Sequence, residues 1–184
     1  MRSTVRLLLA ALLTLLACGA GAAERAENPK DQLLDCAGNQ KEKIRTLAQK
    51  GVPYLMTLLR SEDRIVRYSA MMALGESGMQ DKAAMARLLD LCNGKDIEDA
   101  YFALIALAHG RAPEANALIA RFAKSDTPQL REAACYAIGE SRDSKLYPLL
   151  DGLATEGDEQ TKAIARIVKN RIEKASQERN PPQR

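Results

Sequence analysis

The sequence is poor in aromatic and cysteine residues. It has no tryptophan, one histidine and four cysteines in 184 residues, and aromatic residues make up 4% of the chain. Hydrophobic residues nevertheless reach 46%, which is enough for one domain whose core is built from aliphatic side chains. Four cysteines are too few for a disulfide-rich scaffold, and a chain of this length does not need one to fold.

The chain also lacks an excess of either charge. Its 27 lysines and arginines nearly balance its 24 aspartates and glutamates, which argues against a disordered polyelectrolyte and against a dedicated nucleic-acid binder. One long apolar run is present, at residues 7–17, and it has about half of the roughly 20 residues that a membrane-spanning helix needs. We therefore expect neither nucleic-acid binding nor a transmembrane helix.

Residues 1–23 have the pattern of a secretory signal peptide. Arg2 and Arg6 give a positive start, the apolar run follows, and small residues occupy positions 18–23. A buried first helix of the fold is a weaker interpretation because this segment has no polar face. Removing residues 1–23 takes away two of the 27 basic residues and no acid, so the net charge falls from +3 to +1. A surface so close to neutral has no electrostatic reason to attract nucleic acid or anionic lipid.

Two ways of processing this signal fit the same residues. The sequence LLAC at residues 15–18 resembles a bacterial lipobox, although Leu16 stands where a smaller residue is usual. This resemblance implies that Cys18 is lipidated, that the signal is residues 1–17 and, because Gly19 is not aspartate, that the protein is an outer-membrane lipoprotein. Ordinary cleavage after residue 23 instead leaves a soluble periplasmic or secreted protein. Both predict export, with a lipid anchor as the only expected contact with a membrane.

The central part of the chain repeats itself about every 32 residues. Residues 63–77 read DRIVRYSAMMALGES and recur as TPQLREAACYAIGES at residues 127–141, 64 positions later. A middle copy and a degraded last copy continue the same pattern at offsets of 33 and 31 positions. The equivalent alanines of the four copies are Ala70, Ala103, Ala134 and Ala165. A fixed period of this length is the mark of a repeat architecture.

Each copy contains two helical stripes. Val66, Ala70 and Leu74 follow the spacing of one helical face, and Leu55 and Leu59 do so on a second helix. Segments that contain glycine, which suits the end of a helix, separate the stripes at 51, 75–78, 110–113 and 139–143. No strand pattern appears. The sequence predicts an all-α fold, an α–α superhelix of about four helical hairpins.

The stretch VPYLMTLLRSEDRIVRYSAMMALGES at residues 52–77 resembles a HEAT repeat of the short bacterial type. Pro53 opens one helix, Asp63 lies in the linking turn, and Arg67 begins the next helix. Arg131 repeats the position of Arg67. The resemblance implies a HEAT-like α-solenoid in which Asp63, Arg67 and Arg131 have structural roles.

The resemblance covers about residues 40–175, which we predict to be the repeat domain. The third copy has Ala100 in place of the arginine, so an unbroken ladder of arginine–aspartate pairs is not expected. Residues 24–39 form a lead-in segment. Residues 176–184 are polar and include Pro181 and Pro182, which predicts a disordered tail.

The sequence offers little for catalysis. Some HEAT-like proteins are metal-dependent hydroxylases with paired His-Glu motifs, but this chain has only His109, which we expect to be an exposed structural residue at a helix C-terminus. Cys36, Cys92 and Cys135 lie in different units without a CxxC motif, so we expect no metal site and favour buried thiols. A disulfide between two of them stays open. We therefore expect no cofactor and no enzyme activity.

Alignment of the helices that carry the stripe of Leu55 and Leu59 predicts an exposed surface of mixed charge. Thr57, Arg87 and Asp151 fall in one column, and Arg60 and Asp90 fall in the next. Mixed polarity fits recognition of another protein, whose identity the sequence does not give. We predict a non-enzymatic scaffold or adaptor of the bacterial cell envelope. The alternative is a HEAT-type enzyme that handles a small molecule or chromophore, since some HEAT-like proteins act on bilins.

Overall fold

The computed structural model describes residues 40–77 and 79–179. The expected signal peptide, the lead-in segment, Cys18 and Cys36 lie outside the described residues. The chain divides into two units, Met1–Lys43 and Ile44–Arg184.

Helices are the only regular secondary structure in the described part of the chain, which has no strand. Its α-helices are α3 (Gln40–Ala48), α4 (Val52–Leu58), α5 (Arg64–Ser77), α6 (Lys82–Cys92), α7 (Ile97–His109), α8 (Ala115–Ala123), α9 (Pro128–Ser141), α10 (Tyr147–Glu156) and α11 (Glu159–Arg179), and a 3-10 helix, η1 (Ser144–Leu146), precedes α10. The predicted all-α fold is confirmed. None of the helices in these two ranges combines the length and apolarity that a bilayer crossing requires.

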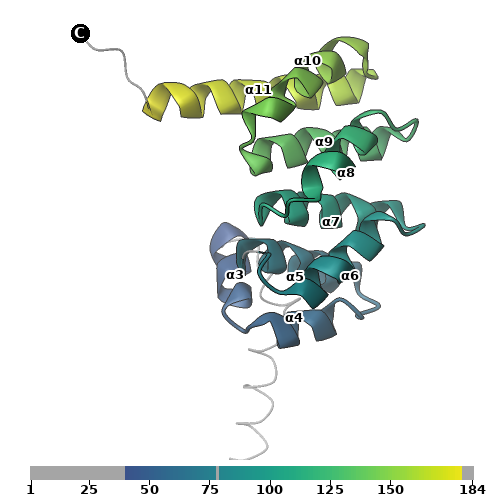
Figure 1. Cartoon of the computed structure of the whole chain (residues 1–184), viewed down its shortest axis with the longest axis vertical. Coiled ribbons are helices and arrows are strands. Elements are labelled where there is room, and N and C mark those ends of the chain that lie inside the picture. Colours follow the sequence, from purple (N-terminus) through teal and green to yellow (C-terminus); the bar gives the residue numbers. More distant parts are fainter. Residues whose placement is uncertain (1–39, 78, 180–184) are drawn as a thin grey trace, which may run out of the picture. The chain divides into compact units, whose positions relative to one another are not determined.

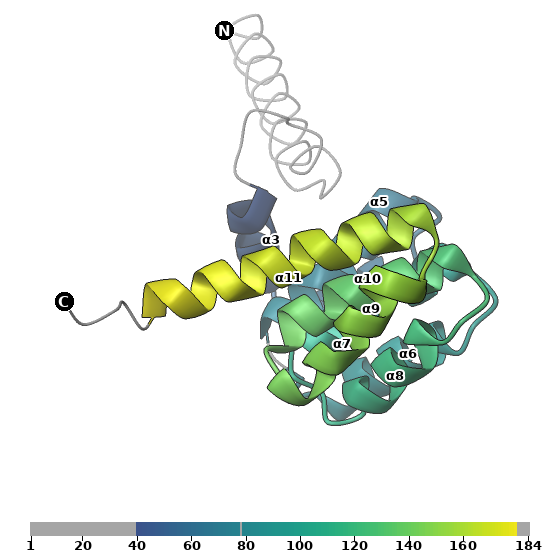
Figure 2. The same cartoon turned by 90° about the horizontal axis from the view of Figure 1, so that it is seen from above.

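The helices pair into four hairpins: α4–α5, α6–α7, α8–α9 and α10–α11. The second helix of each hairpin packs on the second helix of the next, so that α5, α7, α9 and α11 form one stacked layer (Figure 1). The first helices of the hairpins, α4, α6, α8 and α10, form a second layer beside it; α6 and α8 lie on the same side of the stack in the view from above (Figure 2). This arrangement confirms the α-solenoid.

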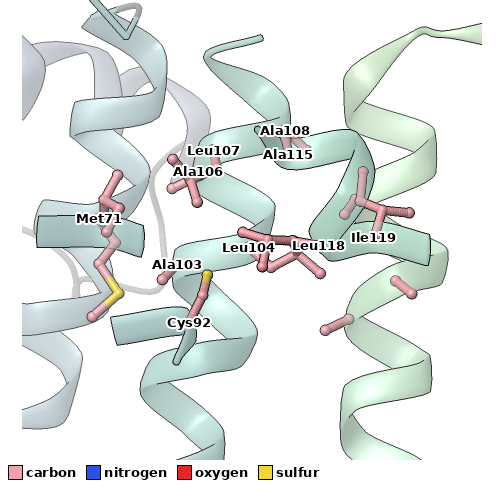
Figure 3. Packing of buried hydrophobic residues seen from close by; sticks show 14 of the residues in the cluster. Met71, Cys92, Ala103, Leu104, Ala106, Leu107, Ala108, Ala115, Leu118 and Ile119 are labelled. Atoms are coloured by element: carbon pink, nitrogen blue, oxygen red, sulfur yellow. The ribbon is translucent and has the colours of Figure 1, made fainter. Parts of the chain in front are cut away.

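Small side chains allow the stacked layer to close tightly. The equivalent alanines of the four copies are all 0% exposed: Ala70, Ala103, Ala134 and Ala165. Larger aliphatic residues fill the space between the two layers, as Leu104, Leu118 and Ile119 do in Figure 3. Burial of such side chains contributes about 1.5–3 kcal/mol each, and the core is therefore continuous from one repeat to the next.

Aspartates at repeat positions start several of the helices. The carboxylate of Asp96 accepts hydrogen bonds from the backbone N–H groups of Glu98 and Asp99 at the start of α7. Asp158 does the same for Gln160 and Thr161 at the start of α11. Such caps satisfy backbone donors that a helix leaves unpaired. Proline enters the first turn of α4, α9 and α10, where its missing N–H costs nothing.

Glycine has a different role from the one expected. Gly75 and Gly139 lie inside α5 and α9 rather than in the turns that follow. An added Cβ at Gly75 would lie 2.7 Å from the backbone oxygen of Ala106, so glycine permits close approach of α5 and α7. The left-handed turn positions after α7 and α9 are instead occupied by Arg111 and Arg142, with φ of 58° and 56°.

The last helix is longer than expected. We predicted that the repeat domain ends at residue 175 and that the tail is disordered from residue 176, but α11 continues to Arg179. The added segment, SQER, contains no proline or glycine, so nothing in it interrupts the helix. Residues 180–184 lie outside the described residues.

Candidate protein-interaction surface

The residues of the predicted binding surface all lie in or just after helices of the second layer, and all are exposed. The Thr57 hydroxyl donates to the backbone oxygen of Tyr54 at 2.7 Å. Asp151 accepts from the Lys169 ammonium at 2.6 Å, which ties α10 to α11. The other three predicted residues, Arg60, Arg87 and Asp90, carry charges of both signs. Asp151 is therefore partly committed to a contact within the chain.

Arg67 joins two neighbouring repeats. Its Nε donates to the carboxylate of Asp99 at 3.1 Å, and its Nη1 donates to the backbone oxygens of Ser61 and Glu62 in the turn before α5. The Arg67 and Asp99 side chains are only 14% and 13% exposed. Asp63 shapes the same turn by accepting from the backbone N–H of Ile65 at 3.0 Å. Arg67 therefore connects the turn between α4 and α5 to α7 in the next hairpin.

Arg131 makes the equivalent connection farther along the stack. It donates to the backbone oxygen of Ser125 and to the carboxylate of Asp158, each at 2.6 Å. The hydrogen bonds of Asp158 to Thr161 and Arg131 hold the pKa of its carboxyl well below the usual range. The third copy has Ala100 at this position, buried at 3% exposure, and so supplies no arginine between these two connections.

A pocket of about 500 Å³ opens next to Arg131, between α8, α10 and the turns that follow them. Its polar lining includes Arg131 and Asp158, which are bonded to each other. Two of the charged residues in this pocket, Arg131 and Asp158, therefore connect repeats.

A row of apolar side chains crosses the stacked layer at one repeat position. We call Met72, Ile105, Tyr136 and Ile167 the apolar row; they lie on α5, α7, α9 and α11, 33, 31 and 31 positions apart. Ile105 is 8% exposed, Met72 and Tyr136 are half-buried, and Ile167 is 64% exposed. Because consecutive helices of the layer pack on one another, the apolar row runs from repeat to repeat as a strip of equivalent positions.

Aromatic rings extend this strip by one helical turn. Tyr68 and Phe102 are stacked with centroids 4.1 Å apart, and Tyr101 contacts both Phe102, at 5.1 Å, and Tyr136, at 6.3 Å. These four rings belong to a chain with only five tyrosines and two phenylalanines. Most of the aromatic surface is thus concentrated on one face of the stacked layer.

The Tyr68 ring is fixed at its polar end. Its hydroxyl donates to Glu98 at 2.6 Å, and Arg64 donates to the same carboxylate oxygen at 2.6 Å. Burial, followed by the hydrogen bond to Glu98, raises the pKa of Tyr68. The tyrosine therefore stays neutral at physiological pH, and its ring edge is held in place beside the apolar row.

A row of charged residues lies one turn C-terminal to the apolar row. We call Arg45, Glu76, His109, Glu140 and Arg171 the charge row. Arg45 donates to Glu76 at 2.8 Å, and Arg171 donates to Glu140 at 3.3 Å. The two imidazole nitrogens of His109 lie 2.8 Å from Glu76 and 2.9 Å from Glu140. Each member bonds to the next repeat, so the row spans α3 to α11 without a gap.

The contacts of the charge row shift the pKa values of its members. The hydrogen bond to Glu140, more than that to Glu76, raises the pKa of His109 against the effect of burial. Arg45 first and His109 second lower the pKa of Glu76, and His109 lowers the pKa of Glu140. The expectation of an exposed His109 is therefore only partly right: it ends α7, but its side chain is 27% exposed and held between carboxylates.

The two described cysteines are buried free thiols that do not form a disulfide with each other. Burial raises the pKa of both Cys92 and Cys135 to about 12, which keeps them protonated and unreactive. Across residues 40–77 and 79–179, no three or more His, Cys, Asp or Glu side chains gather where a metal ion could bind.

Neither row was predicted from the sequence, although both have a signal in it. The repeat offsets of 33 and 31 positions relate the buried alanines. Applied to Met72 and to Glu76, the same offsets give the apolar row and the charge row.

The comparison with known families agrees with the geometry. Residues 85–168, from α6 to α11, match a family of HEAT repeats. No curated protein matches the chain. The matched residues include most of three of the four described hairpins, and α4–α5 repeats the same arrangement on the N-terminal side. The structure is therefore an all-α solenoid that is similar to HEAT repeats over residues 85–168.

Proposed function

We propose that this chain is a non-enzymatic protein-binding module of the bacterial cell envelope, and that it binds its partner through the apolar row. The observation that carries the proposal is the row itself: four apolar side chains at one repeat position, ending at Ile167, which is 64% exposed. Repeat proteins use such extended surfaces to bind other proteins.

The composition of this face supports a protein as the partner. Tyrosine, methionine and other apolar residues are enriched in the centres of protein interfaces, while charged residues form the rim. Here Met72 and Tyr136 lie in the strip, and the charge row borders it. The charges of that border already pair with one another, so a partner has no strong single-sign field to match.

We also propose that the chain has no catalytic role. The polar groups with the strongest contacts, Arg131 with Asp158 and His109 with its two glutamates, all join one repeat to another. Turnover or tight retention of a small molecule by the purified protein would favour the alternative, a HEAT-type small-molecule enzyme, with the pocket beside Arg131 as its site.

The binding surface is tested by crosslinking the exported protein in its own cells and identifying captured proteins by mass spectrometry. We expect one envelope protein to be captured by the wild type and its yield to fall at least about tenfold in Ile167→Glu, since a charge at a buried apolar contact costs more than 1.4 kcal/mol.

Ile97→Glu is the matched control, because Ile97 is 43% exposed on α7 but lies outside the apolar row; it should keep the wild-type yield. A double variant, Arg87→Ala with Asp151→Ala, tests the second layer. Loss of capture in that double variant, with capture retained in Ile167→Glu, would place the partner on the mixed-charge columns and overturn the assignment to the apolar row.

For location, we propose export to the periplasm or, through lipidation of Cys18, to the outer membrane. The apolar run at residues 7–17 and the LLAC sequence support this. Cys18→Ser should move the protein from the detergent phase to the aqueous phase, or leave it uncleaved. A wild-type protein found wholly in the aqueous phase would contradict lipidation and favour cleavage after residue 23.

A further inference from the structure

We propose that His109 is a proton-operated connection between three consecutive repeats, closed when its imidazole is charged and open on one side when the imidazole is neutral. Its side chain extends from the end of α7 and meets a glutamate on each neighbouring helix of the stacked layer. Glu76 comes from α5 and Glu140 from α9. One imidazole thus joins the preceding and the following repeat.

The two protonation states of His109 differ in the number of hydrogen-bond donors that the imidazole supplies. Nε2 lies 2.8 Å from Glu76 and Nδ1 lies 2.9 Å from Glu140. An ionised carboxylate only accepts hydrogen bonds, so each contact needs an N–H on the imidazole. The charged imidazole has two N–H groups and the neutral one has a single N–H. Both contacts can therefore exist together only in the charged form.

Loss of the proton leaves one nitrogen lone pair facing a carboxylate oxygen at contact distance. Two acceptors repel each other at that separation, and the half-buried site weakens screening by water. His109 then has to turn away from one glutamate. The contact between α7 and either α5 or α9 loses its charged hydrogen bond, while the neighbouring contact is kept.

The surrounding charges keep the two glutamates ionised and in place. Arg45 donates to Glu76 from α3, and Arg171 donates to Glu140 from α11; Arg142, in the turn after α9, also lowers the pKa of Glu140. The helices α6 and α8 also pack on α7, but among the described residues they present no hydrogen-bonding or ion-pairing group to His109. The proton on His109 is therefore the variable part of the row.

The sign of the pH effect follows from these contacts. Its two glutamates raise the pKa of His109 above the usual 6.5, so its stabilising effect is complete below pH 6.5 and is lost as the pH rises through the folded-state pKa. The pKa values of Glu76 and Glu140 are lowered from 4.5. The stabilising effect of these glutamates is therefore complete above pH 4.5 and is lost as the pH falls through their folded-state pKa values. The row stabilises the stack most between these limits, in mildly acidic solution.

The test uses the purified chain without a polyhistidine tag, in which His109 is the only histidine. The Cε1–H of its imidazole gives one NMR signal, whose titration midpoint should lie above 6.5. The melting temperature should fall as the pH rises through the same midpoint. His109→Gln should show no such fall over that interval.

Glu140→Gln keeps the test decisive if His109→Gln folds poorly. A glutamine amide can donate to the neutral imidazole, and the substitution removes one anion beside His109, so the midpoint should move down towards 6.5 and the pH-dependent fall should shrink. A wild-type midpoint at or below 6.5 overturns the proposal. So does a melting temperature that falls equally in the wild type and in Glu140→Gln.

Discussion

Replacement of Ala134 with arginine is expected to lower the free energy of unfolding by several kcal/mol, about 3 or more, and to leave much of the protein unfolded at 37 °C. Ala134 is 0% exposed in α9, at the position where neighbouring helices of the stacked layer meet. An arginine there both overfills the contact and buries a charge. Denaturation followed by circular dichroism measures the loss.

Ala117→Arg provides the matched control. Ala117 is also in a helix, α8, but its side chain is exposed, so the same substitution should change the free energy of unfolding by less than about 0.5 kcal/mol. A wild-type melting temperature for Ala134→Arg would mean that the stacked layer does not have the register described above.

The second large effect is expected from two glycine-to-alanine substitutions, which should change the free energy of unfolding in opposite directions. At Gly75, a Cβ would lie 2.7 Å from the backbone oxygen of Ala106. Backbone cannot turn aside as a side chain can, so α5 and α7 must separate, and we expect a net destabilisation of about 1–2 kcal/mol after the gain in helix propensity.

Gly152, inside α10, has no atom within 4 Å of the added Cβ. Gly152→Ala should therefore stabilise the protein by about 0.5–1 kcal/mol, the difference in helix propensity alone. Urea denaturation of the two variants and the wild type gives both values. Equal changes of the same sign would show that Gly75 is not at a close contact.

The sequence predicted the solenoid because its buried positions repeat. Alanine at residues 70, 103, 134 and 165 is fully buried in each copy, and a period in buried positions is sufficient to identify stacked helical hairpins. The role of glycine was harder to predict, since a glycine near a helix end fits either a turn or a close contact. In α5 and α9 the glycines lie at close contacts with the neighbouring helix. Arg111 and Arg142 occupy the left-handed turns instead, at some cost in strain.

The candidate surface was predictable only in part. The mixed-charge columns of the second layer follow from aligning one set of helices. The apolar row was hidden because an apolar residue in a helix is normally assigned to the core, and only the structure shows that Ile167 is 64% exposed. The charge row was hidden because pairing between repeats depends on how closely the helices approach, which residue spacing along the chain does not give.

Site-specific photocrosslinking tests the central claim, that the apolar row contacts the partner, most directly. A photoreactive phenylalanine placed at Tyr136 on α9 replaces a ring in the apolar row, and the same replacement at Tyr147 on α10 places it in the second layer; both tyrosines are half-buried. Our account predicts that irradiation of cells joins the Tyr136 variant, and not the Tyr147 variant, to one envelope protein. Crosslinking from Tyr147 alone would contradict it.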